Sequence, residues 1–174
     1  MINKKGVNSM YKIGDYVVHN GHGVCTILDE VFNQTMNKEF LKLETVHNKM
    51  SIMMPKDKTN DFLRPILSKE EIIRHINEGS NLSNDYNKDN KERKNQFQEL
   101  VTSNNINDTI QLLRYLYQLA ADKKKEKKSL GSFDSQFLQQ AERKLFNELA
   151  ITAEISKEEA HNYIINILKD NEEE

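Results

Sequence analysis

The sequence contains one cysteine, two prolines and no tryptophan among its 174 residues. A single cysteine cannot build an internal disulfide framework, so we expect a protein of the reducing cytoplasm. No apolar run approaches the roughly 20 residues that cross a bilayer, and the sequence therefore predicts no membrane span. The first nine residues lack the apolar centre of a secretory signal. We expect residues 1–9 to be a flexible extension, with Met10 as an alternative start to Met1.

Motifs of enzymes and metal sites are also missing. There is no Gly-x-Ser-x-Gly elbow, no His-Glu-x-x-His and no motif of paired helical carboxylates that would indicate catalysis. The sequence thus predicts no enzyme, no cofactor and no small-molecule substrate, and an enzymatic role would rest on His19, His22 and Cys25 alone. These three residues are fewer than the four ligands of a structural zinc site. Cys25 falls in a strand pattern typical of a buried, inert thiol.

Two glycines, Gly21 and Gly23, flank His22 between two apolar runs. A phosphate-binding glycine loop would need a helix directly after it, and none is predicted here. We therefore expect glycine to provide a positive φ in a turn between two strands.

Charge is nearly balanced, with 25 basic and 27 acidic residues, but it is unevenly distributed. Residues 88–150 carry 12 basic and 9 acidic side chains, whereas residues 151–174 carry 2 and 7 and end in an acidic tail, 171–174. Two basic groups stand out: Lys88, Lys91, Arg93 and Lys94, and the run Lys123, Lys124, Lys125, Lys127 and Lys128. Each group fits either a solvated helix surface or a patch that contacts nucleic-acid phosphates.

Residues 10–67 are predicted to form a small antiparallel β-barrel. Four runs of high strand propensity, Tyr16–Val18, Val24–Leu28, Phe40–Leu43 and Met50–Met54, are separated by turn residues. Four or five strands in about 50 residues leave no room for crossover helices, which favours a barrel. Tyr11, Tyr16 and Phe40 are expected in its core.

The rest of the chain is predicted to be helical. The capping box Ser68-Lys69-Glu70-Glu71 begins a short helix that ends at Gly79, and residues 68–87 make up this helix and a polar linker. Residues 88–170 show apolar stripes at helical spacing and a second capping box, Ser156-Lys157-Glu158-Glu159. We expect a bundle of four or five helices. The predicted fold class is α+β with two domains.

Several segments resemble the CarD/CdnL family of bacterial transcription regulators. The resemblance covers most of residues 10–152, and its N-terminal part is similar also to the polymerase-binding module of transcription-repair coupling factors. The segments are YKIGDYVV (11–18), GHGV (21–24), FLKL (40–43), IMMP (52–55), LRPILSKEE (63–71), residues 112–119, Leu130, LQQA (138–141) and LFNELA (145–150).

The resemblance implies a Tudor-like barrel that docks on the RNA polymerase β subunit, and a helical domain that contacts promoter DNA at the upstream edge of the melted region. It implies an effect on the stability of the open promoter complex without covalent chemistry. If the polymerase contact forms by pairing at a strand edge, we expect it to involve Val31, Phe32, Lys49, Ser51 and Met53. For the DNA contact, which would combine phosphate contacts with a minor-groove wedge, we expect Tyr86, Lys88, Lys91, Arg93, Lys94 and the lysine run Lys123, Lys124, Lys125, Lys127 and Lys128.

The sequence departs from the family at the wedge. Alignment on residues 96–100 puts Asp89 where the family usually has a tryptophan, and Tyr86 is an alternative wedge only if the linker shifts. Two hypotheses therefore stand. The protein is a regulator that engages polymerase and DNA, or it is a protein-interaction adaptor that binds polymerase or another partner without DNA.

Overall fold

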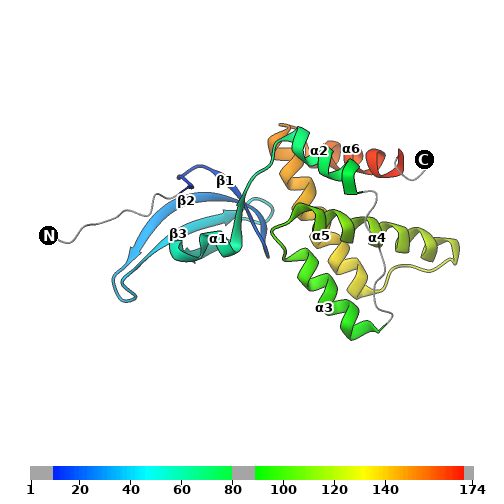
Figure 1. Ribbon diagram of the computed structural model, residues 1–174, viewed down its shortest axis with the longest axis horizontal. Helices are drawn as coiled ribbons and strands as arrows, with labels where there is room; N and C mark the ends of the chain where they lie inside the picture. The colour runs from blue at the N-terminus through cyan, green and yellow to red at the C-terminus, as the bar shows by residue number, and fades with distance from the viewer. Residues whose placement is uncertain (1–9, 80–88, 171–174) are drawn as a thin grey trace.

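The computed structural model describes residues 10–79 and 89–170. Its first half is an antiparallel sheet, and its second half is a group of helices that packs beside one end of that sheet (Figure 1). The predicted order of β before α is confirmed. No helix in these described ranges is long and apolar enough to cross a bilayer.

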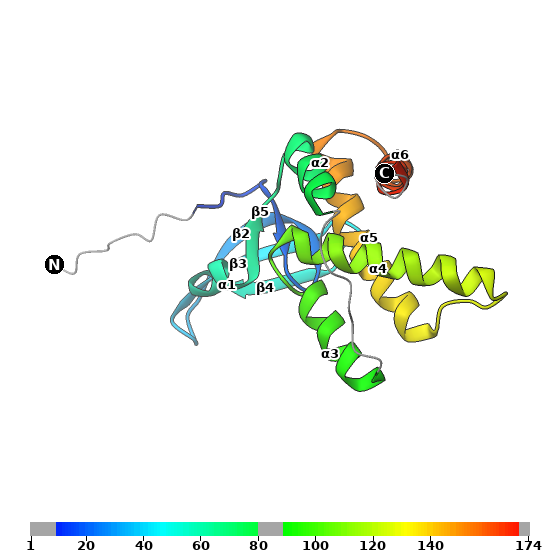
Figure 2. The same cartoon turned by 45° about the vertical axis from the view of Figure 1, so that its right-hand side comes forward.

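Among the residues that the structure describes, five strands form the sheet in the order β4-β3-β2-β1-β5, with every neighbouring pair antiparallel. They are β1 (Tyr16–His19), β2 (Gly23–Asn33), β3 (Lys38–Thr45), β4 (Ser51–Pro55) and β5 (Leu63–Pro65). The first four coincide with the predicted runs. A 3₁₀ turn (Lys56–Lys58) and the short helix α1 (Thr59–Phe62) lead from β4 to β5. By this order β4 and β5 are the two edges of the sheet; both strands are labelled in Figure 2.

The expected barrel is present as an open sheet. Closure would need hydrogen bonds between β4 and β5, but β4 pairs with β3 and the three-residue β5 pairs with β1 in the described part of the chain. The helical connection from β4 to β5 replaces the hairpin that would have joined these two edges. What the structure supports is an antiparallel five-stranded sheet followed by helices.

Strand alternation sets the core of the sheet half. Leu41 and Leu43 of β3 are fully buried, while their neighbours Phe40 and Lys42 face the other way. The buried cluster consists of Tyr11, Val17, Cys25, Ile27, Leu41, Leu43, Met54 and Leu63. Burial raises the pKa of the Cys25 thiol to about 12, so the thiol stays protonated and inert as expected.

In the described residues of the second half there are five helices: α2 (Lys69–Glu78), α3 (Asn90–Val101), α4 (Ile106–Lys125), α5 (Ser132–Thr152) and α6 (Lys157–Asp170). Their common core includes Leu113 and Leu116 of α4, Leu145 and Leu149 of α5, and Ile164 of α6. Helix α2, which the sequence assigns to the segment before the bundle, also contributes Ile72 and Ile76 to this core.

Both predicted capping boxes are confirmed. In α2 the Ser68 hydroxyl accepts from the Glu71 amide and the Glu71 carboxylate accepts from the Ser68 amide. Ser156 and Glu159 repeat this exchange at α6. These bonds lower the pKa of both glutamates, with the backbone amide of the serine as the largest cause.

Helix α5 ends in a Schellman motif whose left-handed residue is not glycine. The Ile155 amide donates to the Ala150 carbonyl at 3.0 Å, and the Glu154 amide donates to the Ile151 carbonyl at 3.3 Å. Glu154 has φ 53°, a conformation that costs an L-residue with a side chain roughly 1 kcal/mol.

Replacing Glu154 by glycine is expected to stabilise the protein by about 1 kcal/mol, because glycine adopts this φ without steric cost. The melting temperature should rise by about 2–4 °C. Glu154→Ala, which removes the same carboxylate but keeps a Cβ, is the matched control and should leave the melting temperature nearly unchanged. Equal shifts in the two variants would attribute the effect to charge instead of backbone conformation.

Candidate functional site

The first candidate surface is the free edge of β4. The Thr45 amide donates to the Met50 carbonyl, and hydrogen-bonded pairs alternate along an antiparallel ladder. Ile52 and Met54 therefore bond to β3, whereas the backbone N–H and C=O groups of Ser51 and Met53 point away from the sheet. The backbone of Pro55, two residues after Met53, also points away from β3, and this position suits proline because no N–H group is needed there to pair with β3.

Side chains on one face of the sheet accompany this edge. Across the sheet, Lys42 of β3 lies between Met53 of β4 and Asp29 of β2. In the same way, Phe40 of β3 lies between Pro55 of β4 and Val31 of β2. Directly opposed residues project from the same face, so Ser51, Met53 and Val31 share it. Met53 is 49% exposed.

Phe32 does not join them. It lies opposite Glu39, one position along from Val31, and therefore projects from the other face. Lys49 lies in the loop before β4, with φ 60° and its ammonium 3.3 Å from the Glu44 carboxylate. The structure thus brings three of the five proposed polymerase-binding residues onto one face, places Lys49 beside them and separates Phe32.

Two aromatic residues expected in the core lie elsewhere. Tyr11 is buried, but Tyr16 is 44% exposed and Phe40 is only partly buried. Both belong to the outer face because they alternate with the buried Val17 and Leu41. Phe40 therefore adds apolar surface beside Val31, a contribution that sequence reasoning missed. The period of two in residues 40–44 was the signal that could have found it.

The second candidate surface is the start of α3. Asp89 is its N-cap: its Oδ1 accepts from the amides of Lys91 at 2.9 Å and Glu92 at 3.0 Å. The acid at the expected wedge position therefore has a structural role at a helix N-terminus, where a carboxylate is favoured. Lys91 and Lys94 are exposed. Tyr86 and Lys88 lie outside the described residues.

Arg93 differs from the neighbouring lysines because it is engaged within the protein. Its Nη2 lies 3.6 Å from the Asp134 carboxylate, and its guanidinium lies 5.6 Å from the centre of the Phe133 ring. Only 17% of its side chain is exposed. These contacts join the first turn of α3 to the first turn of α5 and compete with any phosphate contact.

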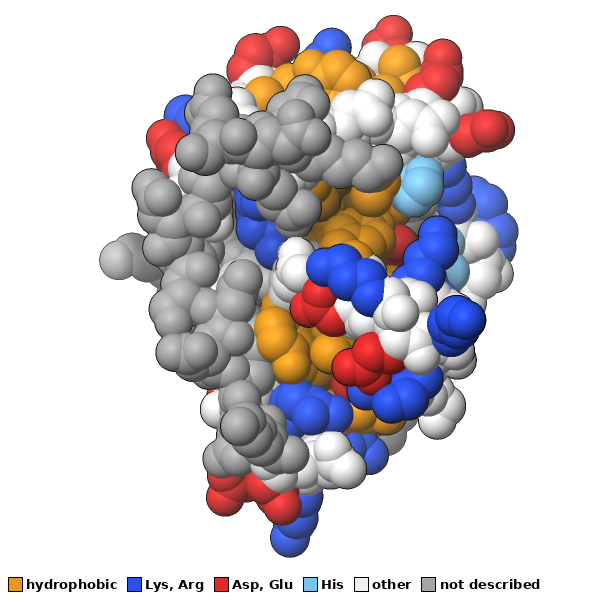
Figure 3. All heavy atoms as spheres, turned by 90° about the vertical axis from the view of Figure 1, so that its right-hand side faces the viewer, with side chains coloured by type: hydrophobic (Ala, Val, Ile, Leu, Met, Phe, Trp, Pro, Cys, Tyr) orange, Lys and Arg blue, Asp and Glu red, His pale blue; other side chains and the backbone are white. Residues whose placement is uncertain are grey.

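The lysine run lies at the C-terminal end of α4 and in the loop that follows it. Lys125 pairs with Asp122 at 3.1 Å and Lys128 with Glu126 at 2.9 Å, and the Lys125 contact is the largest cause of the lowered pKa of Asp122. The run and the start of α3 lie at the same end of the molecule, away from the sheet (Figures 1 and 2). Figure 3 shows basic and acidic side chains mixed over this end.

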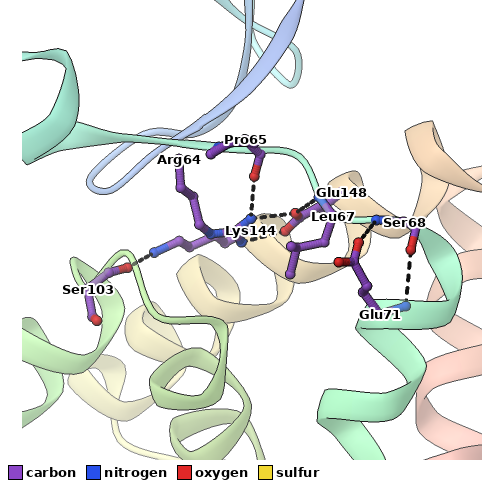
Figure 4. Close-up of polar contacts among 8 residues, drawn as sticks. All are labelled: Arg64, Pro65, Leu67, Ser68, Glu71, Ser103, Lys144 and Glu148. Carbon is purple, nitrogen blue, oxygen red and sulfur yellow. Dashed lines mark hydrogen bonds and ion pairs between the residues drawn. The ribbon is translucent and has the colours of Figure 1, made fainter. Parts of the chain in front are cut away.

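A third group of residues, absent from the predictions, fixes the two halves to each other. Both terminal nitrogens of Arg64 donate to the Glu148 carboxylate at 2.6 Å, and the Leu67 amide donates to the same carboxylate at 2.9 Å (Figure 4). One turn earlier on α5, the Lys144 ammonium donates to the Asn20 carbonyl of the sheet half and to the carbonyls of Val101 and Ser103 in the helical half. The only trace of this group in the sequence is a lysine and a glutamate four apart beside an apolar stripe.

The glycine turn is part of the same contact between halves. Gly23 has φ 74°, and a Cβ placed there would lie 3.7 Å from the Lys144 Cα, so the expected positive φ is confirmed at Gly23. His19 Nδ1 accepts from the Gly21 amide at 3.1 Å. Burial, then repulsion from His22 and Lys144, lowers the pKa of His19 to about 4. Within residues 10–79 and 89–170, no three His, Cys, Asp or Glu side chains are arranged to hold a metal ion.

Comparison with protein families gives two matches. The model of the CarD-like/TRCF RID domain matches residues 11–67, which hold the whole sheet. The model of the CarD C-terminal domain matches residues 75–165, more than half of the chain, from within α2 into α6. Among curated proteins, none matches the chain.

Proposed function

Because the chain belongs to the CarD family, whose members are transcription-related and interact with RNA polymerase, we propose that it binds the polymerase β subunit through its sheet and contacts upstream promoter DNA through its helices. It would thereby change the stability of the open promoter complex of a bacterial promoter. Proteins of this family are regulatory and not enzymatic, and the inert Cys25 and neutral His19 agree with such a role.

The free edge of β4 is the observation that carries the polymerase half of this proposal. Ser51 and Met53 offer outward N–H and C=O groups to a strand of a partner, which supplies affinity through backbone hydrogen bonds. Apolar side chains of Val31, Phe40 and Met53 on the adjacent face supply side-chain contacts beside that strand.

Introducing a charge at this edge is expected to weaken binding to the polymerase β subunit at least tenfold. The variant is Ser51→Glu, and a pull-down followed by a titration measures the change, where tenfold corresponds to about 1.4 kcal/mol. Ser129→Glu places the same charge in the exposed loop after α4 and should bind like wild type. Failure of the wild-type protein to bind the β subunit would overturn the proposal.

The DNA half rests on the position of Lys91, Lys94 and the lysine run at one end of the helices. Phosphate contacts by lysine give affinity without sequence choice. Two observations argue against a minor-groove wedge at this surface. Asp89 caps α3, and Arg93 is engaged with Asp134 and Phe133 within the protein. These two observations favour the adaptor as the second candidate function, in which polymerase is bound and DNA is not.

Changing the five lysines of the run to glutamine separates these two functions. If they contact phosphates, the slope of log affinity against log salt should decrease by about 4–5, since each lost contact removes about 0.9. An electrophoretic shift of promoter DNA with polymerase present measures this slope. Five arginines at the same positions keep the charge and should keep the slope. Identical salt dependence in the glutamine variant would support the adaptor.

A further inference from the structure

A cleft of about 230 Å³ lies between the two halves of the molecule. The β1–β2 turn (residues 20–23) lines it from the sheet side, together with His47, Asn48 and Met50 of the β3–β4 connection. Val101 at the end of α3 and Gln140, Arg143 and Lys144 of α5 line it from the helical side. None of the described residues that line it is acidic, although acidic residues outnumber basic ones in the whole chain.

Positive charge is concentrated around this cleft. Arg143 and Lys144 line it together with two histidines, His22 and His47. The pKa of His47 is lowered, chiefly by burial and then by repulsion from Arg143, Lys157 and His22, so Lys157 also contributes to the local field. The Arg143 Nη1 lies 3.3 Å from His47 Nε2, a contact in which the arginine donates to a neutral imidazole.

Lys144 provides a buried cation without a carboxylate partner in its own hydrogen bonds. The residue is 4% exposed, and its ammonium donates to the carbonyls of Val101, Ser103 and Asn20 (Figure 4 shows the bond to Ser103). Glu148, one turn away, is occupied by Arg64 and the Leu67 amide. Burial, followed by repulsion from Arg64, lowers the pKa of Lys144 to about 8, and attraction to Glu148 and Asp108 opposes this shift only in part. A negative group in the cleft would relieve this cost.

We propose that this cleft binds the phosphate group of a small molecule, which is either inorganic phosphate or the terminal phosphate of a nucleotide. The exposed guanidinium of Arg143 would donate two parallel hydrogen bonds to phosphate oxygens. The buried ammonium of Lys144 would contribute positive charge from within the protein. The side-chain amides of Asn48 and Gln140 add neutral donors, since the Asn48 Oδ1 already accepts from the Thr45 hydroxyl. Two neighbouring cations favour a doubly charged phosphate group over a singly charged carboxylate.

Such a ligand would touch both halves at once. It would bind only when the sheet and α5 are in their native arrangement, and so it would stabilise that arrangement by mass action. This inference is independent of the polymerase and DNA contacts proposed above, because neither surface includes Arg143 or Lys144.

The test measures binding of inorganic phosphate and of adenosine diphosphate to the full chain by calorimetry and thermal unfolding, at constant ionic strength in chloride. Adenosine is the uncharged comparison. Arg143→Gln should weaken phosphate binding at least tenfold, because Arg143 is exposed and its loss leaves the core intact. Arg74→Gln, a change at an exposed arginine of α2, is the matched control and should bind like wild type.

The two phosphate probes distinguish the source of the ligand. Equal affinity for phosphate and the diphosphate would identify the phosphate group alone as the ligand, and much tighter binding of the diphosphate would identify a nucleotide. The proposal is overturned if neither probe binds, or if Arg143→Gln and Arg74→Gln bind alike. It is also overturned if duplex DNA, but neither small probe, binds in a manner that depends on Arg143.

Discussion

The Glu148→Ala protein is expected to lose about 3–5 kcal/mol of its free energy of unfolding, because the substitution leaves a buried guanidinium without its counter-ion. The Glu148 side chain is 0% exposed and that of Arg64 is 13% exposed. The same change also removes the acceptor of the Leu67 amide, which is a part-buried polar group. Chemical denaturation monitored by circular dichroism measures the loss.

Glu78→Ala is the matched control for this prediction. Glu78 pairs with Arg74 four residues earlier on α2, and both side chains are more than half exposed. Removing such a surface pair should cost about 0.2–0.5 kcal/mol. Replacing both members of the buried pair, Arg64→Met with Glu148→Leu, should recover much of the lost stability because neither position then holds an unpaired charge. Similar losses in Glu148→Ala and Glu78→Ala would show that the buried pair does not hold the halves together.

Truncation of Phe97 is the second substitution with a large expected effect, about 3–5 kcal/mol. Phe97 is 0% exposed, and its ring lies 5.6 Å from Tyr115 and 5.7 Å from both Phe133 and Phe137, between centroids. Phe97 and Val101 are the buried residues of α3. Phe97→Ala should therefore release α3 from α4 and α5, with fast amide hydrogen exchange along α3.

A comparison with an exposed phenylalanine gives this prediction its control. Phe32 is 54% exposed on β2, so Phe32→Ala should change stability far less, within about 0.5–1 kcal/mol. Exchange along α6 should remain slow in Phe97→Ala, because α6 packs on α5 and α2 through other residues. Fast exchange throughout the helical half would instead mean that Phe97 supports the entire bundle.

Local patterns in the sequence predict much of this fold. The β-branched runs locate β1 to β4, and the two capping boxes locate the starts of α2 and α6, because each signal depends on neighbouring residues only. β5 escaped prediction because three residues that include Pro65 carry too weak a strand signal. The open state of the sheet also depends on which strands pair, and strand propensity does not specify pairing.

The candidate sites divide in the same way. Alternation along β4 and register with β3 make the shared face of Ser51 and Met53 accessible to sequence reasoning. The capping role of Asp89 could also have been found, since Asp89 is followed three positions later by Glu92, a spacing typical of helix starts. The pair of Arg64 and Glu148 could not, because 84 residues separate its members and no periodicity connects them.

The buried pair also turns the molecule into a spacer of fixed length. The chain passes from β5 to α2 within a few residues. Arg64, at the start of this connection, binds Glu148 and so attaches the connection to α5. The sheet lies at one end of the long axis of the molecule and the basic end of α4 at the other (Figure 1). A partner gripped at the sheet is therefore kept at a set distance and angle from whatever the helices touch. Weakening the contact between Arg64 and Glu148 would change the distance and angle between the two halves before it changed the affinity of either binding surface.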